Sequence, residues 1–302
     1  MSIVLAILMV AGSLPFAYAG TDDVTLVGSG TEDDPYLISN SAQLAIIAGW
    51  VGVYTVGFVK ITADIGTGTA ADHNAPVDFS LGVESFQKFN GHLDGCNHTI
   101  VMNSNRPLIA CNIGTVENLT MAGTVTGGGG LLVDVNEGGT IRNCGNTVNS
   151  TNGAGLCGTN KNGVIIINCY NTGNITSTNN ATLYAGGICK INSTDASIIN
   201  CYNTGSVTGP VHVGGIVGNN RANVINCYSN GKITATDKDD YCGAICGLSE
   251  YGASYQNCYY NKEFGNRATN NYPLSGTDIV EGLTAAECKG ASGTTNALLD
   301  TM

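Results

Sequence analysis

The sequence predicts an all-β protein: a parallel β-helix (β-solenoid) with coils of roughly 25–32 residues and a short N-terminal capping helix. The hexapeptide NCYNTG stands at 168–173 and again at 200–205, and NCYSNG follows at 226–231. Gly, Asn, Thr, Val and Ile dominate the chain, and β-branched residues between turn formers favour strands over long helices. This period indicates coils that bury their apolar faces against the coils above and below.

The first 19 residues are expected to form a secretory signal peptide. Residues 3–11 are apolar without interruption, Pro15 follows, and 17–19 (AYA) supply an A-x-A cleavage pattern before Gly20. A membrane helix is the alternative, but it needs about 20 apolar residues, and this run is shorter and broken by proline. We therefore expect a secreted or cell-surface mature chain, with no stable membrane span after cleavage.

Residues 20–88 are expected to hold an N-terminal cap and the first strands. The segment 41–48 (SAQLAIIA) is the best helix candidate in the chain, with Ser41 at the capping position. The ends of a solenoid expose unpaired strand edges, which invite aggregation unless they are covered. We expect this helix to close the N-terminal end of the core.

The repeats align on a shared asparagine, in steps of 25, 25, 32, 26 and 31 residues. An apolar column stands two places before that asparagine: Val116, Ile141, Ile166, Ile198, Val224 and Tyr255. A second apolar column directly follows it: Leu119, Cys144, Cys169, Cys201, Cys227 and Cys258. Columns three places apart cannot both face inward along a straight strand, because side chains alternate with period two. The chain is therefore expected to bend between them.

An asparagine in this bend explains why the hexapeptide recurs. Asparagine is well able to adopt the left-handed conformation that such a bend uses, and its side chain bonds nearby backbone groups. We expect stacked coils to bring these amides above one another in a hydrogen-bonded ladder, with the thiols buried behind them. The predicted ladder residues are Asn118, Asn143, Asn168, Asn200, Asn226 and Asn257.

A second signature lies between these corners. It reads GLLVDVN (130–136), GLCGTN (155–160), GGICKIN (186–192), GGIVGNN (214–220) and GAICGLS (243–249). Together with the corners it resembles the GLUG-motif repeat of bacterial surface and adhesin-like proteins and of some surface-anchored IgA-cleaving peptidases. The first segment lacks the second glycine column, and Gly145 stands where other corners have tyrosine. These coils are expected to be irregular.

The resemblance covers roughly residues 28–290 and implies how the chain is organised. Residues 28–48 look like the leader that opens such solenoids, and 58–65 look like the strand after it. Residues 89–262 hold the solenoid repeats, and 263–302 look like the final coil and its tail.

Twelve cysteines in a secreted chain first suggest disulfides. Their columns favour stacked core thiols, because Val217 replaces cysteine in the column of Cys157 and Cys189, as expected for small buried hydrophobes. Parallel Cβ directions also fit poorly with a disulfide dihedral of about 90°. A few disulfides, Cys96–Cys111 or one between Cys242 and a neighbour, are the alternative. The spacing of a zinc site is absent, so we expect neither a metal nor a cofactor.

Four tyrosines follow the corner cysteines and are predicted to face outward as a row of exposed rings. They are Tyr170, Tyr202, Tyr228 and Tyr259. Tyrosine offers an apolar face with a polar tip, which suits a platform for sugar rings or a partner surface. The alternative is a self-stacking ladder that only covers the turn. These four are the candidate ligand-binding residues.

No constellation of catalytic residues is evident in the sequence. The acids in the repeats follow no column: Asp134, Glu137, Asp195 and Glu250. Those in the N-terminal part are Asp64, Asp72, Asp78 and Asp94, where a loop with His73 offers a cleft as the alternative to solvated carboxylates. HExxH and GxSxG are absent. TDKDDY (236–241) lacks the EF-hand spacing, so we expect an acidic loop rather than a calcium site.

The acidic balance, with a net charge of −11, argues against nucleic acid as a partner. The expected function is an adhesin-like binding or spacer module without catalytic activity, at the cell surface or secreted. Its expected partner is a surface glycan or a host or other extracellular protein. One alternative is a polysaccharide-active β-helix enzyme, a lyase or hydrolase, with a carboxylate-lined cleft. The other is a structural filament or layer subunit, and the sequence does not indicate an oligomeric state.

Overall fold

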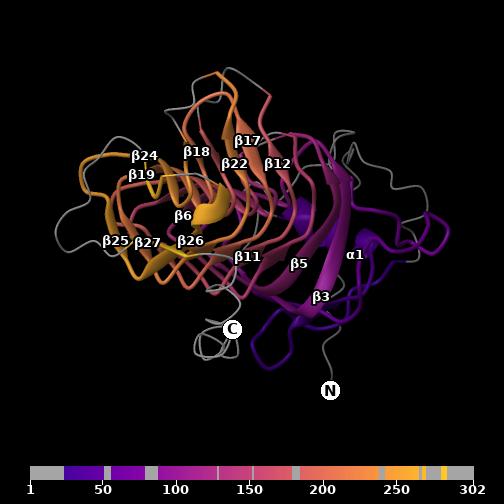
Figure 1. Ribbon diagram of the computed structural model, residues 1–302. Helices are drawn as coiled ribbons and strands as arrows, with labels where there is room; N and C mark the ends of the chain where they lie inside the picture. The colour runs from indigo at the N-terminus through magenta and orange to yellow at the C-terminus, as the bar shows by residue number, and fades with distance from the viewer. Residues whose placement is uncertain are drawn as a thin grey trace.

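The computed structural model describes residues 24–50, 56–78, 88–127, 129–151, 153–178, 184–237, 242–264, 267–269 and 280–283. In these ranges the chain winds into stacked coils of parallel strands, from α1 and β3 at one end to β26 and β27 at the other (Figure 1). The predicted parallel β-helix is confirmed. The predicted signal peptide, 1–19, lies outside the described residues. No helix in the described ranges is long and apolar enough to span a membrane.

The N-terminal elements build the first, longer-stranded coils. They are β1 (Tyr36–Ile38), α1 (Ser41–Trp50), β2 (Phe58–Ile61), β3 (His92–Ser104), β4 (Ile109–Asn112), β5 (Thr115–Val125) and β6 (Val133–Glu137). The strands β7 (Thr140–Arg142), β8 (Gly145–Asn146) and β9 (Cys157–Lys161) complete the next coil. The strand β5 pairs with both β7 and β8. The bend at the corner asparagine therefore lies within one continuous strand in β5, whereas in the next coil it separates two strands, β7 and β8.

The later coils each repeat five short strands. One holds β10 (Ile165–Ile167), β11 (Tyr170–Asn171), β12 (Ile175–Thr176), β13 (Ala185–Gly186) and β14 (Cys189–Asn192). The next holds β15 (Ser197–Ile199), β16 (Tyr202–Asn203), β17 (Val207–Gly209), β18 (Val213–Gly214) and β19 (Val217–Asn220). The third holds β20 (Asn223–Ile225), β21 (Tyr228–Ser229), β22 (Ile233–Ala235), β23 (Cys242–Gly243) and β24 (Cys246–Ser249). The chain continues with β25 (Ser254–Gln256), β26 (Cys258–Asn261), the 3₁₀ turn Lys262–Phe264 and β27 (Val280–Leu283).

Equivalent strands of successive coils pair in parallel and in register. Ile166 aligns with Ile141 on one side and with Ile198 on the other, and Ile198 aligns in turn with Val224. The strands of the five GLUG segments form their own row behind β4, in the order β4, β6, β9, β14, β19, β24. Since the side-chain period is two, this register keeps every inward column in the core. The two apolar columns around the corner asparagines are accordingly buried.

The helix α1 covers the N-terminal end of the core. Leu44 and Ile47 are fully buried and belong to the same apolar cluster as the first strands. The capping residue is Asn40, whose side-chain oxygen accepts a hydrogen bond from the Gln43 backbone N–H at 2.9 Å. The prediction of Ser41 as the cap is therefore wrong by one residue, because the Ser41 hydroxyl instead donates to the His73 carbonyl at 3.0 Å. That bond ties the helix to the loop at 66–78.

Candidate functional site

The outer corner of the coils carries a continuous ladder of asparagine amides. Each corner asparagine has a positive φ between 51° and 54°, the left-handed conformation that the bend requires. Each Nδ2 donates to the Oδ1 of the asparagine in the preceding coil, at 2.9–3.2 Å. The chain of bonds runs from Asn257 through Asn226, Asn200, Asn168 and Asn143 to Asn118.

The ladder ends at its N-terminal side on a carboxylate. Asn118 Nδ2 donates to Asp94 Oδ1 at 2.9 Å, and the Cys96 backbone N–H donates to the same oxygen. A carboxylate only accepts hydrogen bonds, so Asn118 must present its NH₂ group to Asp94 and its carbonyl to Asn143. Burial alone would raise the pKa of Asp94, but the bonds from Asn118 and Cys96 outweigh it and lower that pKa.

The four candidate tyrosines lie in one row next to this ladder. Tyr170, Tyr202, Tyr228 and Tyr259 align in register across β11, β16, β21 and β26. The sequence predicts them to be exposed, but all four residues are only partly exposed. The Tyr170 and Tyr202 rings are nearly parallel, with an interplanar angle of 12° and centroids 5.5 Å apart.

Gly145 shapes the N-terminal end of the tyrosine row. It pairs in register with Tyr170 and with Thr120, so the strand pairing at this corner is regular. The coil departs from the later ones further on, where Ser150 and Ala154 form isolated bridges instead of strands. A Cβ at this position would stand 2.1 Å from the Tyr170 ring, which therefore lies over the glycine. The Tyr170 hydroxyl reaches the Thr120 hydroxyl at 3.3 Å. The missing tyrosine thus lets Tyr170 cover two coils.

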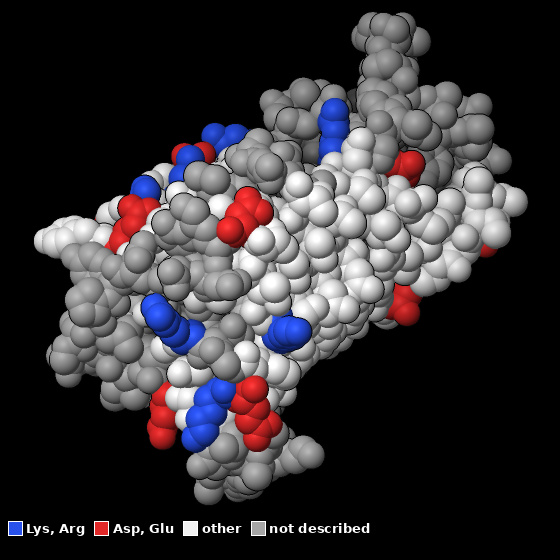
Figure 2. Space-filling model, turned by 45° about the horizontal axis from the view of Figure 1, so that its top comes forward, with Lys and Arg blue, Asp and Glu red and all other residues white. Residues whose placement is uncertain are grey.

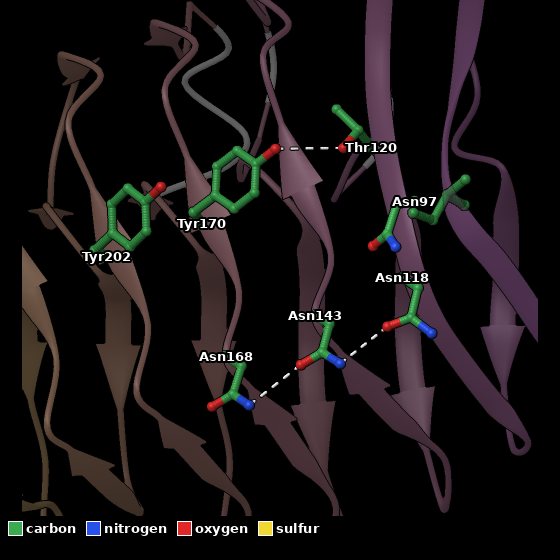
Figure 3. Close-up of a pocket in the computed structure, with 8 residues that line it drawn as sticks. Asn97, Asn118, Thr120, Asn143, Asn168, Tyr170 and Tyr202 are labelled. Atoms are coloured by element: carbon green, nitrogen blue, oxygen red, sulfur yellow. Dashed lines mark hydrogen bonds between the residues drawn. The ribbon is translucent and has the colours of Figure 1, made fainter. Parts of the chain in front are cut away.

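A shallow groove of about 350 Å³ lies between the tyrosine row and the amide ladder. Figure 3 shows the Tyr170 and Tyr202 rings side by side along the coil stack, with the row of Asn118, Asn143 and Asn168 next to them. The lining residues are Asn97, Asn118, Leu119, Thr120, Asn143, Asn168, Tyr170 and Tyr202. The groove therefore combines an aromatic surface with a row of amides and contains no charged side chain among these residues. Tyr228 and Tyr259, the other two predicted binding residues, lie further along the row and do not line it.

Sequence reasoning missed two further asparagine ladders, which lie inside the coils. In the GLUG wall, the side chains of Asn112, Asn136, Asn160, Asn192 and Asn220 are joined in order by amide hydrogen bonds of 2.8–3.0 Å. Behind the tyrosine row, Asn146 donates to Asn171, and Asn171 donates to Asn203. All of these residues are fully buried. The signal was visible, since asparagine ends four of the five GLUG segments and stands fourth in NCYNTG.

The corner cysteines are buried free thiols. Cys144, Cys169, Cys201, Cys227 and Cys258 are at most 1% exposed, and none of these five forms a disulfide. Several donate to backbone carbonyls two residues earlier, for example Cys201 Sγ to Ile199 O at 3.2 Å. Cys96 is exposed, whereas Cys111 contacts Glu137 in the GLUG wall. The alternative of a Cys96–Cys111 disulfide is not what the structure shows.

The acidic side chains are held by separate local partners. Asp64 accepts from the Thr99 N–H, Asp72 from the Thr69 N–H, and Asp134 from the Gly129 N–H. Glu137 pairs with Lys161 at 3.0 Å, and Glu250 pairs with Arg221 at 2.9 Å. None of these acids lines the groove. Within the described ranges, no group of three His, Cys, Asp or Glu side chains is arranged to hold a metal ion.

One charged cluster lies on the outer face of the N-terminal wall and meets the groove at Asp94, which accepts the hydrogen bond from the lining residue Asn118. Lys60, Asp94, Glu117 and Arg142 align across adjacent strands, and Glu117 bonds both His92 and Arg142. Burial alone would raise the pKa of Glu117, but the hydrogen bonds from Arg142 and His92 leave it below its ordinary value. Figure 2 shows small mixed groups of charges around a broad uncharged surface, with no large patch of one sign in that view.

Comparisons with known proteins agree with this architecture. The family model for the GLUG motif matches residues 209–234, one turn of the solenoid, which confirms the resemblance seen in the sequence. The fold is similar to a crystal structure from Bacteroides ovatus that is provisionally named as an immunoglobulin A1 protease. That similarity has a TM-score of 0.64 and 20% sequence identity over 91% of this chain and 90% of the other, and it shows the fold alone. No curated protein matches the sequence.

Proposed function

We propose that this GLUG-motif repeat protein is a non-catalytic, adhesin-like binding module, secreted or displayed at the cell surface, that holds a glycan in the groove beside Tyr170 and Tyr202. The observation that carries the proposal is the pairing of the two surfaces of that groove. Two nearly parallel, stacked tyrosine rings form an aromatic surface, and a row of amides runs next to it. Sugar rings need both, because their C–H faces stack on aromatic rings while their hydroxyls hydrogen-bond.

The distribution of carboxylates supports binding rather than cleavage. Glycoside hydrolysis uses a pair of carboxyl groups on either side of the scissile bond. The groove is lined by amides, one threonine, one leucine and two tyrosines, and the acids already described are engaged elsewhere. A glycoside hydrolase acting here would lack its pair of carboxyl groups among the lining residues. The Bacteroides ovatus protein shares only the fold at this level of identity, so its name assigns no peptidase chemistry to this chain.

The location outside the cytoplasm rests on the sequence. The apolar segment at 3–11 and the AYA pattern at 17–19 are typical of a secreted precursor. Repetition of the same wall over many coils also suits a protein that presents a site at a distance from its attachment point, because a solenoid lengthens by adding coils.

The test is a binding screen with the mature chain, residues 20–302, on an array of surface glycans, followed by calorimetry on those that bind. The double variant Tyr170→Ala/Tyr202→Ala is expected to weaken binding at least about fivefold, since each lost stacking contact contributes about 0.5–1.5 kcal/mol. Tyr259→Ala, in the same row but outside the groove, serves as the matched control and is expected to leave affinity unchanged.

Two other outcomes would contradict the proposal. Unchanged affinity in the double variant would show that the groove is not the site. Release of new reducing ends or unsaturated products from a bound glycan would show that the protein is an enzyme. Light scattering on the same samples tests the filament alternative separately, because a filament or layer subunit would assemble without a ligand.

A further inference from the structure

We infer that the groove selects an uncharged glycan and that the bound chain lies along the axis of the coil stack. This inference rests on the proposed function and specifies the ligand class of the same groove. It separates this protein from β-helix proteins that act on acidic polysaccharides.

The first argument is the charge of the groove. None of its eight lining residues is Asp, Glu, Lys, Arg or His. Arg142, which directly precedes Asn143 in the chain, is bonded to the Glu117 carboxylate on the wall outside the groove. The nearest charge along the ladder is the Asp94 carboxylate that ends it. A glycan with carboxylate or sulfate groups would meet no compensating cation here, and it would approach a protein with a net charge of −11.

The second argument is the hydrogen-bonding capacity of the amide row. An asparagine amide has two N–H donors and two acceptor lone pairs on its oxygen. The ladder uses one N–H and one lone pair of Asn118 and of Asn143. Each of these amides therefore keeps one N–H donor and one oxygen lone pair for a ligand. A sugar hydroxyl both donates and accepts and matches this mixture, whereas a carboxylate only accepts and leaves the amide oxygens without donors.

The third argument concerns direction. The lining amides come from successive coils: Asn118 from β5, Asn143 from the corner before β8 and Asn168 from the corner before β11. Tyr170 and Tyr202 likewise come one from each coil. Neighbouring strands lie about 4.8 Å apart, so the amides recur at about that interval along the axis, and the two rings follow one another in the same direction. A linear polymer lying along the axis meets an equivalent amide at successive residues, whereas one crossing the coils would meet a single amide.

The N-terminal end of the groove is set by a bulge in β3. Cys96 and Asn97 both have positive φ, 48° and 64°, and the register of β3 against β5 shifts between Asp94 and His98. This bulge places Asn97 at the edge of the groove, where it is an additional amide beyond the ladder. The row of equivalent contacts therefore ends at β3.

The experiment compares matched pairs of neutral and acidic oligosaccharides by calorimetry. The probes are hexamers such as cellohexaose and β-1,4-mannohexaose, each beside its counterpart oxidised to the uronate at C6. At least one neutral hexamer is expected to bind at least about tenfold more tightly than its uronate, and Tyr170→Ala/Tyr202→Ala is expected to weaken its binding. The hexamer is also expected to bind more tightly than the disaccharide of the same sugar, because it contacts several coils.

Thr120 permits a charge-swap test within the groove. Thr120→Lys is expected to raise uronate affinity at least about tenfold, while Thr120→Gln, of similar length without charge, is expected not to change the preference for neutral chains. Circular dichroism of both variants checks that the coils are intact.

The possible results distinguish this inference from the proposed function. Uronates that bind the wild type as tightly as neutral chains, with the same loss in the tyrosine variant, would overturn the inference and leave the binding function standing. Equal affinities for disaccharide and hexamer would overturn the axial orientation. Binding of no probe in a tyrosine-dependent way would overturn both the inference and the proposed function.

Discussion

At the scale of single residues, asparagine has two different structural roles in this protein. The outer asparagines hold the left-handed corner and are partly accessible to water, as at Asn168. The inner asparagines, such as Asn171, are fully buried and bond both the next amide and a backbone carbonyl. Removing a buried partner leaves other groups unsatisfied, whereas water can replace a partner at the surface. The two kinds of ladder are therefore expected to differ in how much they stabilise the fold.

This difference predicts the effect of two substitutions. Asn171→Ala removes the acceptor of Asn146 and the donor to Asn203 and to Gly173, and is expected to lower the free energy of unfolding by about 3 kcal/mol or more. Asn168→Gly keeps the positive φ without strain and is expected to cost less than about 1 kcal/mol. Denaturant unfolding of both variants measures the two values. Equal losses would contradict the distinction between the ladders.

Glu117 predicts a pH dependence of stability. Its pKa is lowered in the folded protein, so its contribution is fully present above the unfolded pKa of about 4.3 and is lost as the pH falls through the folded value. Glu117→Gln is expected to cost about 1 kcal/mol at pH 7, a figure reduced because Arg142 is half-exposed. The difference from the wild type should shrink below about pH 4. Unfolding free energies measured from pH 7 to pH 3 check this.

The matched control for this prediction is Glu137→Gln. The Glu137 side chain is 41% exposed against 9% for Glu117, and ion pairs of such exposed carboxylates contribute little. A stability difference for Glu117→Gln that grew toward low pH would contradict the assignment.

At the scale of elements, the strands are too short to be stable alone and form only because they pair with the strands of neighbouring coils. β11 and β16 contain two residues each, and the side chains next to them in the chain supply the core contacts. The cysteine column next to these strands is part of the core, with Cys201 between Cys169 and Cys227 in successive coils. Burial raises the pKa of the Cys201 thiol and raises that of Cys246 to about 12. Both thiols are therefore protonated and shielded at neutral pH.

This burial predicts which thiols react. In the native protein at pH 8, an alkylating reagent is expected to modify Cys96, which is exposed, and to leave Cys201 and Cys246 unmodified. Peptide mass spectrometry after timed labelling measures each site, and the same labelling in denaturant provides the control in which all three react. Labelling of Cys201 as fast as Cys96 under native conditions would show that the column is accessible.

At the scale of the whole molecule, the coils behave as stacked units whose contacts are mostly with their neighbours. One coil separates Asn168 from Asn200, and the residues on either side keep the same register. Removing residues 168–199 would join Ile167 to Asn200 and leave every column continuous. In that molecule Tyr202 would lie over Gly145 in place of Tyr170, and Tyr228 would follow it. The groove would be rebuilt from the next coil.

We predict that this in-register deletion folds and keeps glycan binding within about threefold, while its denaturant m-value falls because less surface is exposed on unfolding. Removing only residues 168–183 places half a coil out of register, and this control is expected to unfold or aggregate. Circular dichroism, denaturant titration and calorimetry give the three readouts. Loss of binding in a folded in-register deletion would contradict the interchangeability of Tyr170 and Tyr202.

Much of the architecture is determined by sequence patterns. The spacing of the corner asparagines, the apolar residues on either side of them and the glycine-rich segments between them determine a coil, because each must satisfy local backbone sterics and bury one face. The outer ladder and the buried cysteine column follow from the same alignment. The inner ladders at Asn171 and Asn192 were equally regular in the sequence, yet a polar column does not by itself indicate whether it faces water or the core.

Only the tertiary structure decided how the coils meet, and this determines the site. The sequence by itself made Tyr170, Tyr202, Tyr228 and Tyr259 equivalent, and it made Gly145 a defect. In the folded molecule Tyr170 lies over Gly145 and the groove forms at this end of the row. The physical reason is that ring packing depends on the residue one coil away, at a distance of 25 or 32 positions in the chain. Sequence patterns specify columns, but the contacts across them arise only when the coils stack.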